Sequence, residues 1–545
     1  MPLLSTSIDT RSEIFVKNRE DMIEALAEID AIQEEGKLGG GQKAIDRLIA
    51  KGKLPARERI AKLLDPDSPF MEISPMAGYM THYKVGGGAI VGIGVISGVE
   101  CVVMAHDPSD MGGAMTQLSW MKMMRALELA RVNRLPYIQI IESAGGDLRR
   151  GGQGIDPEWL LRSDLNHFGD TGRLFHEITE LSKLGVPTVS VVCGSSTAGG
   201  AYMPGLSEYT VFIKKAAQVF LAGPPLLRMA TGEIAKAEEL GGADMHASKS
   251  GLADYIAEDE TEGFGMARDI VAHLNWTKKG PGPSKVEFDE PLYDREELLG
   301  MVSKDLKAAL DIREVIARIV DGSEFEEFKP VYSPSMVCGW AHIHGFPVGI
   351  LANNGPIFSE TAQKSTQFIQ LCNARDIPLI FLHNITGYMV GKQYEEGGIV
   401  KHGSQMINAI SNSAVPHISV IVGASYGAGN YGMSGRSFDT RFLFFWPTAK
   451  IAVMGPQQIA GVMSLVRRGQ AAARGIEIDE EKEAKLVAEA AAYQEYTSLA
   501  KFATGRVKDD GIIDPRDTRE ALAMALSATH SNDVKGAEKY GSFRF

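Results

Sequence analysis

The chain has 545 residues, of which 44% are hydrophobic and 23% are charged, a composition typical of soluble globular proteins. Its formal net charge of −13, from 56 basic and 69 acidic residues, argues against nucleic acid as the main partner. Glycine is frequent, at 59 residues, but the glycines follow no three-residue period, so a collagen-like structure is excluded.

The cysteines, the apolar runs and the first residues together lead us to expect a cytoplasmic protein. The four cysteines lie far apart and form no CxxC pair, which disfavours a zinc ribbon and fits a reducing compartment. No stretch approaches about 18 consecutive apolar residues, so we expect no membrane span and no membrane partner. The opening MPLLSTSIDTRSE lacks the basic start and apolar block of a signal peptide.

The predicted elements change along the chain from charged helices to buried strands. Residues 12–65 favour helices, and residues 65–69 then predict a loop because they contain two prolines. Apolar runs at residues 86–95 and 101–105 predict strands. Beyond them, helical segments, prolines, apolar runs and glycine clusters alternate, which is typical of βα units with buried strands.

The two halves of the chain resemble each other. Pro187 precedes the apolar run 188–193 and the cluster 194–202, and Pro416 precedes 417–422 and 423–431 at the same offset of 229 residues (416 − 187). Proline, strand and glycine in series are common in α/β proteins, but several features here keep their order and spacing. We therefore predict two tandem copies of one α/β fold, residues 1–280 and 281–545, joined near the glycine- and proline-rich segment 278–283.

Each glycine cluster follows a predicted strand and precedes a predicted helix. Glycine there allows positive φ and a close ligand approach, and the first N–H groups of the helix then point outward. These donors could cradle a phosphate or form an oxyanion hole. Neither cluster matches GxxxxGK[ST], so an oxyanion hole is the better fit.

Gly423 to Gly427 also matches GxSxG, the nucleophile-elbow pattern of α/β-hydrolases, with Ser425 as nucleophile. Such an esterase needs a later histidine, and only His530 follows. The first cluster, with Ser196 at the matching position, lacks the second glycine. The hydrolase is therefore the weaker hypothesis.

Two further patterns are weaker still. Met121-Lys122-Met123 resembles a biotin-attachment motif, but it lies in a stretch that predicts a helix, so we expect Lys122 to be a surface lysine. His342 and His344 would share one face of a strand but have no nearby acidic or cysteine partner. We therefore expect no metal in this chain.

Several motifs in order resemble one family, the carboxyltransferase (β) subunits of biotin-dependent acyl-CoA carboxylases, over nearly the whole chain. These motifs are residues 52–60 (GKLPARERI), 196–202 (STAGGAY), 220–225 (FLAGPP), 240–246 (LGGADMH), 358–364 (FSETAQK), 384–391 (NITGYMVG) and 425–433 (SYGAGNYGM).

The resemblance implies two tandem crotonase-like domains, with acyl-CoA at the N-terminal one and biotin at the C-terminal one. It implies transfer of a carboxylate from carboxybiotin to the carbon of an acyl-CoA. The biotin would be carried covalently by a biotin carboxylase/biotin carrier (α) subunit. The implied assembly is a β hexamer within an αβ dodecamer, with active sites between domains of different subunits.

The resemblance also implies roles for particular residues. Backbone N–H groups of Gly199 and Gly200 would hold the thioester enolate oxygen, and those of Ala428 and Gly429 the ureido oxygen of biotin, whose ring nitrogen then acts as base. The implied acyl-CoA-binding residues are Gly145, Gly146, Thr197, Ala198 and Ala201, and the implied biotin-binding residues are Phe358, Tyr388, Val390 and Gly427.

The acyl group is harder to assign. Residues 426–433 resemble the methylcrotonyl- and geranyl-CoA branch of the family, which implies a 3-methylcrotonyl or another branched or short acyl group. Residues 143–152 (SAGGDLRRGG) depart from that branch because they are charged. Arg149, Arg150 or Arg162 could bind CoA phosphates or a polar acyl tail, or could be solvated loop residues.

Two competing functions use the same fold. One is a biotin-dependent acyl-CoA decarboxylase subunit, which the sequence separates poorly from a carboxylase subunit. The second is a non-catalytic scaffold of crotonase-like domains. Both glycine clusters are intact, which speaks against a scaffold because a scaffold has no need of aligned backbone donors.

Overall fold

The computed structural model describes residues 1–147, 168–305, 308 and 310–539. Arg149, Arg150 and Arg162 lie outside the described residues. The chain divides into two units: an N-terminal unit of residues 31–279 and 505–507, and a C-terminal unit of residues 1–30, 280–504 and 508–545. The boundary at Lys279 falls within the predicted linker, whereas residues 1–30 belong with the second half of the chain.

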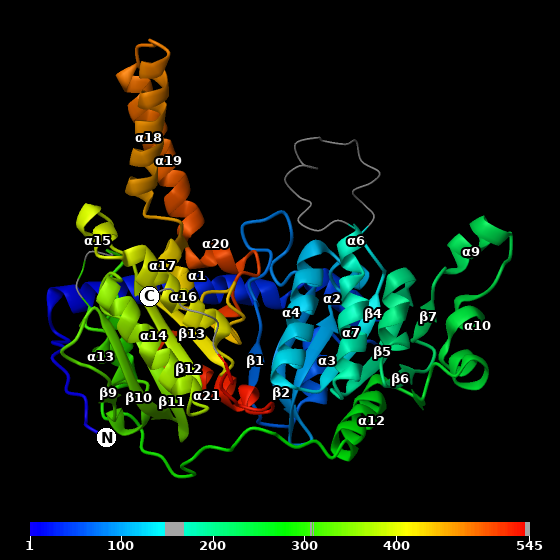
Figure 1. The fold of residues 1–545 in the computed structure, drawn as a ribbon. Helices are drawn as coiled ribbons and strands as arrows, with labels where there is room; N and C mark the ends of the chain where they lie inside the picture. Colours follow the sequence, from blue (N-terminus) through cyan, green and yellow to red (C-terminus); the bar gives the residue numbers. More distant parts are fainter. Residues whose placement is uncertain (148–167, 306–307, 309, 540–545) are drawn as a thin grey trace. The chain divides into compact units, whose positions relative to one another are not determined.

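The N-terminal unit is built on one eight-stranded sheet (Figure 1). The strand order is β1-β2-β3-β4-β5-β6-β8, with β7 beside β5; β1 to β3 are antiparallel and the pairs from β3 onward are parallel. The strands are β1 (Phe70–Glu72), β2 (Ala89–Ile96), β3 (Val99–His106), β4 (Tyr137–Ser143), β5 (Thr188–Thr197), β6 (Tyr209–Ile213), β7 (Gln218–Phe220) and β8 (Tyr255–Ala257).

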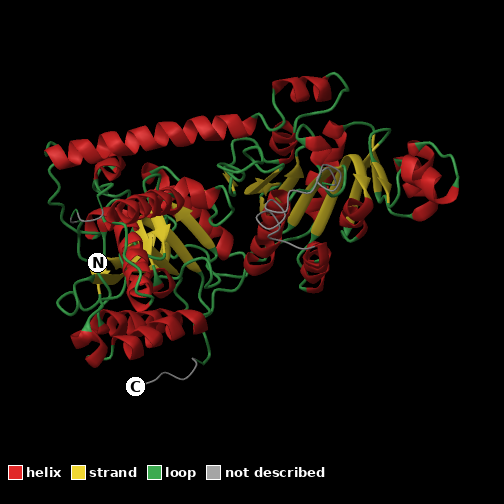
Figure 2. Cartoon of the chain, turned by 90° about the horizontal axis from the view of Figure 1, so that it is seen from above, coloured by secondary structure: helices red, strands yellow, loops and turns green. Residues whose placement is uncertain are grey.

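Helices pack on the strands of this sheet because the central strands are continuous apolar runs that must be covered (Figure 2). Helices α3 and α12 share a core cluster with β2 to β6, while α4 and α7 contact β2, β3 and β5. The helices are α2 (Gln42–Ile49), α3 (Ala56–Leu63), η1 (Met111–Gly113), α4 (Gln117–Asn133), α6 (Phe168–Thr171), α7 (Arg173–Lys183), η3 (Ala198–Ala201), α8 (Tyr202–Gly205), α9 (Pro224–Thr231), α10 (Ala237–Gly241), α11 (Ala243–Met245), η4 (His246–Ser250) and α12 (Glu260–His273).

The C-terminal unit repeats this design. Its sheet has the order β16-β14-β13-β12-β11-β10-β9, with β15 beside β13. The strands are β9 (Glu326–Glu327), β10 (Met336–Ile343), β11 (Phe346–Asn353), β12 (Leu379–Ile385), β13 (His417–Tyr426), β14 (Phe442–Phe445), β15 (Lys450–Ala452) and β16 (Gly511–Ile512). Each strand from β10 to β16 has its counterpart from β2 to β8 in the same place, which confirms the predicted pair of tandem crotonase-like domains.

Helices of the C-terminal unit cover its sheet in the same way, with α14 and α16 in one core cluster with β10 to β12. The helices are α1 (Glu13–Lys37), η5 (Arg295–Gly300), α13 (Arg313–Ile316), η6 (Asp321–Ser323), α14 (Ser359–Asn373), α15 (Lys392–Glu396), α16 (Ile399–Asn412), α17 (Ala428–Gly432), α18 (Pro456–Ala473), α19 (Glu480–Ser498), α20 (Ala500–Thr504), η7 (Pro515–Asp517) and α21 (Thr518–Thr529).

Specific contacts explain why residues 1–30 belong to this unit. The Asn18 side chain donates to the Gly300 carbonyl at 3.1 Å, and a Cβ on Gly300 would lie 2.5 Å from the Phe15 ring. Thr6 Oγ1 donates to the Glu314 carboxylate at 2.7 Å. A sequence repeat cannot reveal such a docking because it depends on contacts between residues about 280 to 310 positions apart.

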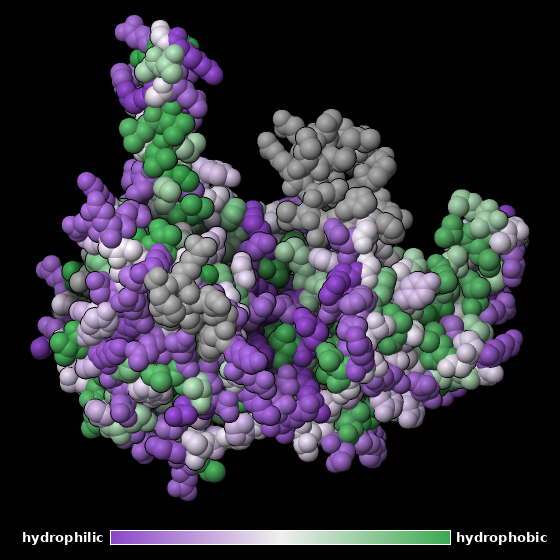
Figure 3. Space-filling view, in the orientation of Figure 1, coloured by the Kyte–Doolittle hydropathy of each residue, from purple (hydrophilic) through white to green (hydrophobic). Residues whose placement is uncertain are grey.

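Each unit carries an arm after its short seventh strand. In the C-terminal unit, α18 and α19 form a helical hairpin that extends away from the sheet, and in the N-terminal unit α9 and α10 lie beyond β7 (Figure 1). Both arms show apolar surface (Figure 3). It includes Leu226, Met229, Ile234, Val462, Met463, Leu465 and Val466, all at least 45% exposed. Apolar surface of this kind is typical of an interaction surface.

Candidate active site

The structure repeats one feature at the carboxyl ends of the central strands in both units. The parallel pairing of β4 with β5 shifts register between Ile141 and Ser143, and that of β12 with β13 shifts between His383 and Ile385. These shifts lie at equivalent positions, at the offset of 242 residues (378 − 136) that relates Pro136 to Pro378. Ligands of parallel α/β sheets bind at this end of the strands, so both turns are candidate sites.

In the N-terminal unit, the turn after β4 meets the turn after β5. Gly145 has φ +86°, and its carbonyl accepts the Met115 N–H at 2.8 Å. A Cβ on Gly145 would lie 3.3 Å from Thr197 Oγ1 and 3.8 Å from the Ala198 Cβ. Gly146 forms a bridge with Met115 and has open space where a side chain would lie. Four of the five predicted acyl-CoA-binding residues therefore lie together.

Gly199 and Gly200 lie in η3, directly beyond this turn. Ala198 begins that helix with φ +53°, a conformation that costs a non-glycine residue free energy and is often kept at functional sites. The Gly200 carbonyl accepts a hydrogen bond from the Ser196 hydroxyl at 2.8 Å. The first N–H groups of a helix have no partner within it, so this turn can donate to an oxygen. Ala201 is buried in a core cluster and not at the exposed face of the turn.

The C-terminal unit has the same turn between β13 and α17. Gly427 takes the place of Ala198, with φ 56° and ψ −145°, a combination open only to glycine. Its N–H donates to the Ala452 carbonyl at 2.8 Å, which leaves Ala428 and Gly429 to open the helix. A Cβ on Gly429 would lie 2.7 Å from Cγ1 of Ile385, so even alanine displaces its surroundings.

Aromatic side chains lie beside this second turn. The Tyr388 segment bridges to Ile357, which precedes Phe358, and a Cβ on Gly432 would lie 2.5 Å from the Tyr388 hydroxyl. The Phe358 ring lies 5.9 Å from the Tyr394 ring. Burial raises the pKa of Tyr388, so its hydroxyl stays neutral. The Val390 side chain, by contrast, is 79% exposed.

A buried charge network holds the strand that leads to the first turn. The Arg59 side chain is completely buried; it donates to both Glu260 oxygens at 2.7 and 3.0 Å and to Glu142 at 2.8 Å. Lys53 also donates to Glu142, which directly precedes Ser143 at the end of β4. The predicted 52–60 motif is thus a positioning element, but its partners Glu142 and Glu260 carry no sequence signal that could have found them.

The position equivalent to Glu142 in the C-terminal unit is uncharged. Asn384 replaces Glu142, and Gly423 replaces Gly194. A Cβ on Gly194 would lie 2.4 Å from the Glu142 carboxyl carbon, and one on Gly423 would lie 2.4 Å from the Asn384 amide oxygen. Glycine at both positions therefore makes room for the polar side chain of the neighbouring strand.

Ser425 has a histidine partner that the sequence did not suggest. His383 Nδ1 lies 2.9 Å from Ser425 Oγ, and the Asn430 amide donates to the same oxygen at 2.8 Å. Ser425 and His383 are completely buried, and burial lowers the pKa of His383 to about 3. A substrate cannot reach this serine and the imidazole is a poor base, so the pair does not support the esterase hypothesis.

The expectation that Lys122 is a surface lysine is wrong. It lies in α4, as predicted, but its side chain is completely buried and donates to the Gly86 carbonyl at 3.1 Å, and burial lowers its pKa to about 8. Lys364, 242 residues later in α14, is also buried and donates to the Met336 carbonyl at 2.8 Å. A biotin-protein ligase could not reach Lys122 in this fold.

The histidines and cysteines do not form a metal site in the described part of the chain. No group of three or more His, Cys, Asp or Glu side chains there could hold a metal ion. His342 lies in β10, but His344 lies in the following turn, so the two do not share a strand. All four cysteines are buried free thiols. Among the described residues, no helix is long and apolar enough to cross a bilayer.

Comparisons with known proteins agree with this geometry. A family model described as a carboxyl transferase domain matches residues 48–542. The chain is 51% identical over 543 residues to a probable biotin-dependent acyl-coenzyme A carboxylase beta2 subunit of Mycobacterium tuberculosis, covering 99% of this chain and 100% of that protein.

Two further relatives extend the match. The chain is 44% identical over 546 residues to the mitochondrial methylcrotonoyl-CoA carboxylase beta chain of Dictyostelium discoideum, covering 99% of this chain and 91% of that one. The crystal structure of the beta subunit of geranyl-CoA carboxylase from P. aeruginosa has a TM-score of 0.88 and 40% identity, with each chain covered completely.

Proposed function

The chain belongs to the carboxyl transferase family, as a β subunit of the biotin-dependent acyl-CoA carboxylases, and from that premise we propose how its two glycine turns divide the reaction. The turn of the N-terminal unit holds the acyl thioester, and the turn of the C-terminal unit holds carboxybiotin. The observation that carries this proposal is the duplication: both units present a register shift, a positive-φ residue and a helix start at equivalent positions.

On the acyl side, the chain must stabilise negative charge on an oxygen. A thioester α-proton, or the γ-proton of an enoyl thioester, leaves readily only when the enolate oxygen accepts hydrogen bonds. The backbone N–H groups of Gly199 and Gly200 donate to it, while Gly145, Gly146 and Thr197 line the approach. One such donor contributes about 3–4 kcal/mol in other enzymes. Ala198 also lines the approach to the acyl thioester, and Ala201 packs behind this turn in the hydrophobic core.

On the biotin side, the residues fit a ureido ring. Carboxybiotin supplies the carboxyl group and, after CO2 has left, a ring nitrogen that can accept the substrate proton. The N–H groups of Ala428 and Gly429 donate to the ureido oxygen, and the positive φ of Gly427 orients these two N–H groups toward it. The rings of Phe358 and Tyr388 offer apolar faces, and Val390 offers an exposed apolar side chain. No side chain of this chain needs to act as acid or base.

The finer assignments rest on the resemblance. We propose a 3-methylcrotonyl or another branched or short acyl group, a separate biotin-carrying α subunit, and a cytoplasmic β hexamer within an αβ dodecamer. The exposed apolar arms α9–α10 and α18–α19 support assembly because such surface favours burial against another chain.

The test is purification of the protein with its native biotinylated partner, followed by ATP- and bicarbonate-dependent carboxylation of a panel of acyl-CoAs. We expect at least one branched or short acyl-CoA to be carboxylated. Decarboxylation of a carboxylated acyl-CoA together with capture of a membrane partner would instead favour the decarboxylase. No activity on any acyl-CoA would overturn the proposal.

A further inference from the structure

Three polar side chains are joined by hydrogen bonds beside the glycine turn of the C-terminal unit. His383 in β12 and Ser425 in β13 are completely buried, and His383 Nδ1 lies 2.9 Å from Ser425 Oγ. The side-chain amide of Asn430 in α17 donates to the same Ser425 oxygen at 2.8 Å. These three side chains, here called the Ser425 network, therefore join two strands of the sheet to the helix that opens with Ala428 and Gly429.

The chemistry of the three groups fixes the direction of both hydrogen bonds. The amide nitrogen of Asn430 can only donate, so Ser425 Oγ accepts that bond, and the Ser425 proton is left for His383 Nδ1. This assigns to His383 the neutral tautomer that carries its proton on Nε2. Burial lowers the pKa of His383 to about 3, so the ring stays a neutral acceptor at physiological pH.

The backbone of Asn430 is held as firmly as its side chain. Its N–H donates to the Gly427 carbonyl at 3.1 Å, and its carbonyl accepts the Gly435 N–H at 3.0 Å. A Cβ on Gly435 would overlap Oδ1 of Asn430, so only glycine leaves room for the amide there. Asn430 directly follows Gly429, so the residue that binds Ser425 also orients the first turn of α17.

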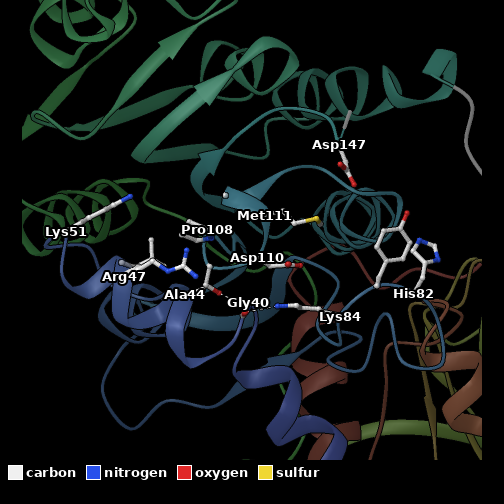
Figure 4. A pocket seen from close by; sticks show the side chains of 14 residues that line it. Gly40, Ala44, Arg47, Lys51, His82, Lys84, Pro108, Asp110, Met111 and Asp147 are labelled. Carbon is white, nitrogen blue, oxygen red and sulfur yellow. Dashed lines mark hydrogen bonds between the residues drawn. The ribbon is translucent and has the colours of Figure 1, made fainter. Parts of the chain in front are cut away.

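The N-terminal unit ties its own turn with the equivalent serine but with a different partner. Ser196 lies 229 positions before Ser425 (425 − 196), and its hydroxyl donates directly to the Gly200 carbonyl at 2.8 Å. A pocket of about 600 Å³ lies beside this turn (Figure 4): Gly112 lines it, and the Gly112 carbonyl accepts the Ala144 N–H at 3.0 Å. Ser196 therefore ties β5 directly to η3 at the edge of this cavity.

Two differences between the halves of the chain create the Ser425 network. His383 corresponds to Ile141 at the offset of 242 residues (383 − 141), and Asn430 corresponds to Ala201 at the offset of 229 (430 − 201). Isoleucine and alanine side chains can neither donate nor accept a hydrogen bond. The network is therefore specific to the C-terminal turn.

We propose that Ser425 is a positioning residue for the biotin half of the reaction, an inference that rests on the proposed function. Held by Asn430 and His383, it fixes the angle at which the Ala428 and Gly429 N–H groups point toward the ureido oxygen. Donors that are fixed in advance need no reorganisation while charge develops on that oxygen. Loss of the network should therefore slow the transfer without weakening the binding of acyl-CoA, which occurs at the other turn.

The test is a single-turnover discharge of the holoenzyme, whose biotin is first carboxylated with ATP and radiolabelled bicarbonate. An acyl-CoA that the wild type carboxylates is then added, and the transfer of label to it is timed. We expect Ser425→Ala to lower the rate constant of discharge about tenfold, with the acyl-CoA concentration for half-maximal rate within about twofold of the wild type. Carboxybiotin formation, which takes place on the partner subunit, should be unchanged.

Matched variants separate positioning from a general loss of stability, and a cooperative urea transition shows which of them are folded. Ser419→Ala removes another buried hydroxyl from β13, which donates to the Ser434 carbonyl at 2.8 Å, and should discharge within about twofold of the wild type. His383→Leu removes the acceptor and should slow discharge as Ser425→Ala does. His383→Asn keeps an acceptor oxygen close to the position of Nδ1 and should restore part of the rate.

Wild-type discharge by a folded Ser425→Ala, or equal slowing by Ser419→Ala, would overturn the proposal. If Ser425→Ala does not fold, the two His383 variants decide, and equal rates in these two would overturn it as well. The wild type separates the two levels of inference. Discharge to an acyl-CoA that the variants leave unchanged refutes the positioning role alone, whereas no discharge to any acyl-CoA refutes the proposed function.

Discussion

Replacing Arg59 by methionine tests whether the buried charge network positions the first glycine turn. The substitution keeps much of the volume of the side chain but removes three hydrogen bonds, to both Glu260 oxygens and to Glu142. Removing one partner of a buried ion pair costs about 3–5 kcal/mol because it leaves an uncompensated buried charge. Lys53 still binds Glu142, so Glu260 bears most of this cost.

The matched control is Arg57→Met on the same helix. Arg57 pairs with Glu72 at 2.7 Å, but its side chain is 32% exposed, and partly exposed pairs are worth about 0–1 kcal/mol. Urea unfolding, with hydrogen exchange of the β4 backbone amides as a second measurement, should show the larger loss of stability only for Arg59→Met. In the transfer assay, kcat should fall because Ser143 to Gly146 move, and Arg59→Lys should restore part of it. Equal destabilisation by the two variants would refute the reasoning.

Three further predictions concern other buried groups. Burial, with the nearby Asp510 charge, raises the pKa of Asp509 from 3.8 to about 8. Because the pKa is higher in the folded than in the unfolded protein, the folded protein keeps this proton at pH values where the unfolded chain has lost it, and the contribution to stability is complete at low pH. As the pH rises, this contribution declines by about 1.4 kcal/mol per pH unit until it is lost above about pH 8. Urea midpoints of the C-terminal unit between pH 5 and 9 should show this decline and its levelling, Asp509→Asn should abolish it, and a pH-independent wild type would contradict it. A serine-directed fluorophosphonate should leave Ser425 unlabelled by mass spectrometry, since the hydroxyl is buried; stoichiometric labelling would revive the esterase. Lys122 should carry no biotin after co-expression with a biotin-protein ligase, and streptavidin capture of the chain through Lys122 would contradict its burial.

The duplicated fold could be predicted because it leaves a local signature twice. Proline, a buried strand and a glycine cluster recur in order, and the positive φ at Gly427 explains why glycine stands there. The family motifs then pointed to the turns that the two sheets present at their strand ends.

The supporting groups could not be predicted because their partners lie far away in the chain. Glu142 meets Arg59 across 83 positions and Glu260 meets it across 201. Lys122 was expected at the surface because lysine is rarely buried completely, and its burial here depends on a carbonyl group of another segment, that of Gly86. His383 has no motif of its own; only the register of β12 on β13 brings it to Ser425.

The central claim is that bare backbone at the two turns performs the transfer, and Gly200→Val tests it most directly. A Cβ at Gly200 would lie 3.2 Å from Ser196 Oγ and 3.6 Å from the Ser143 Cβ, so the two methyl groups of valine push the turn out of place. Gly265→Val in α12, where nothing lies within 4 Å of the added Cβ, is the control. We predict that Gly200→Val remains folded, with a cooperative urea transition, but has a kcat for carboxyl transfer at least about a hundredfold lower than the wild type. The control should turn over normally. Normal turnover in a folded Gly200→Val would contradict the account.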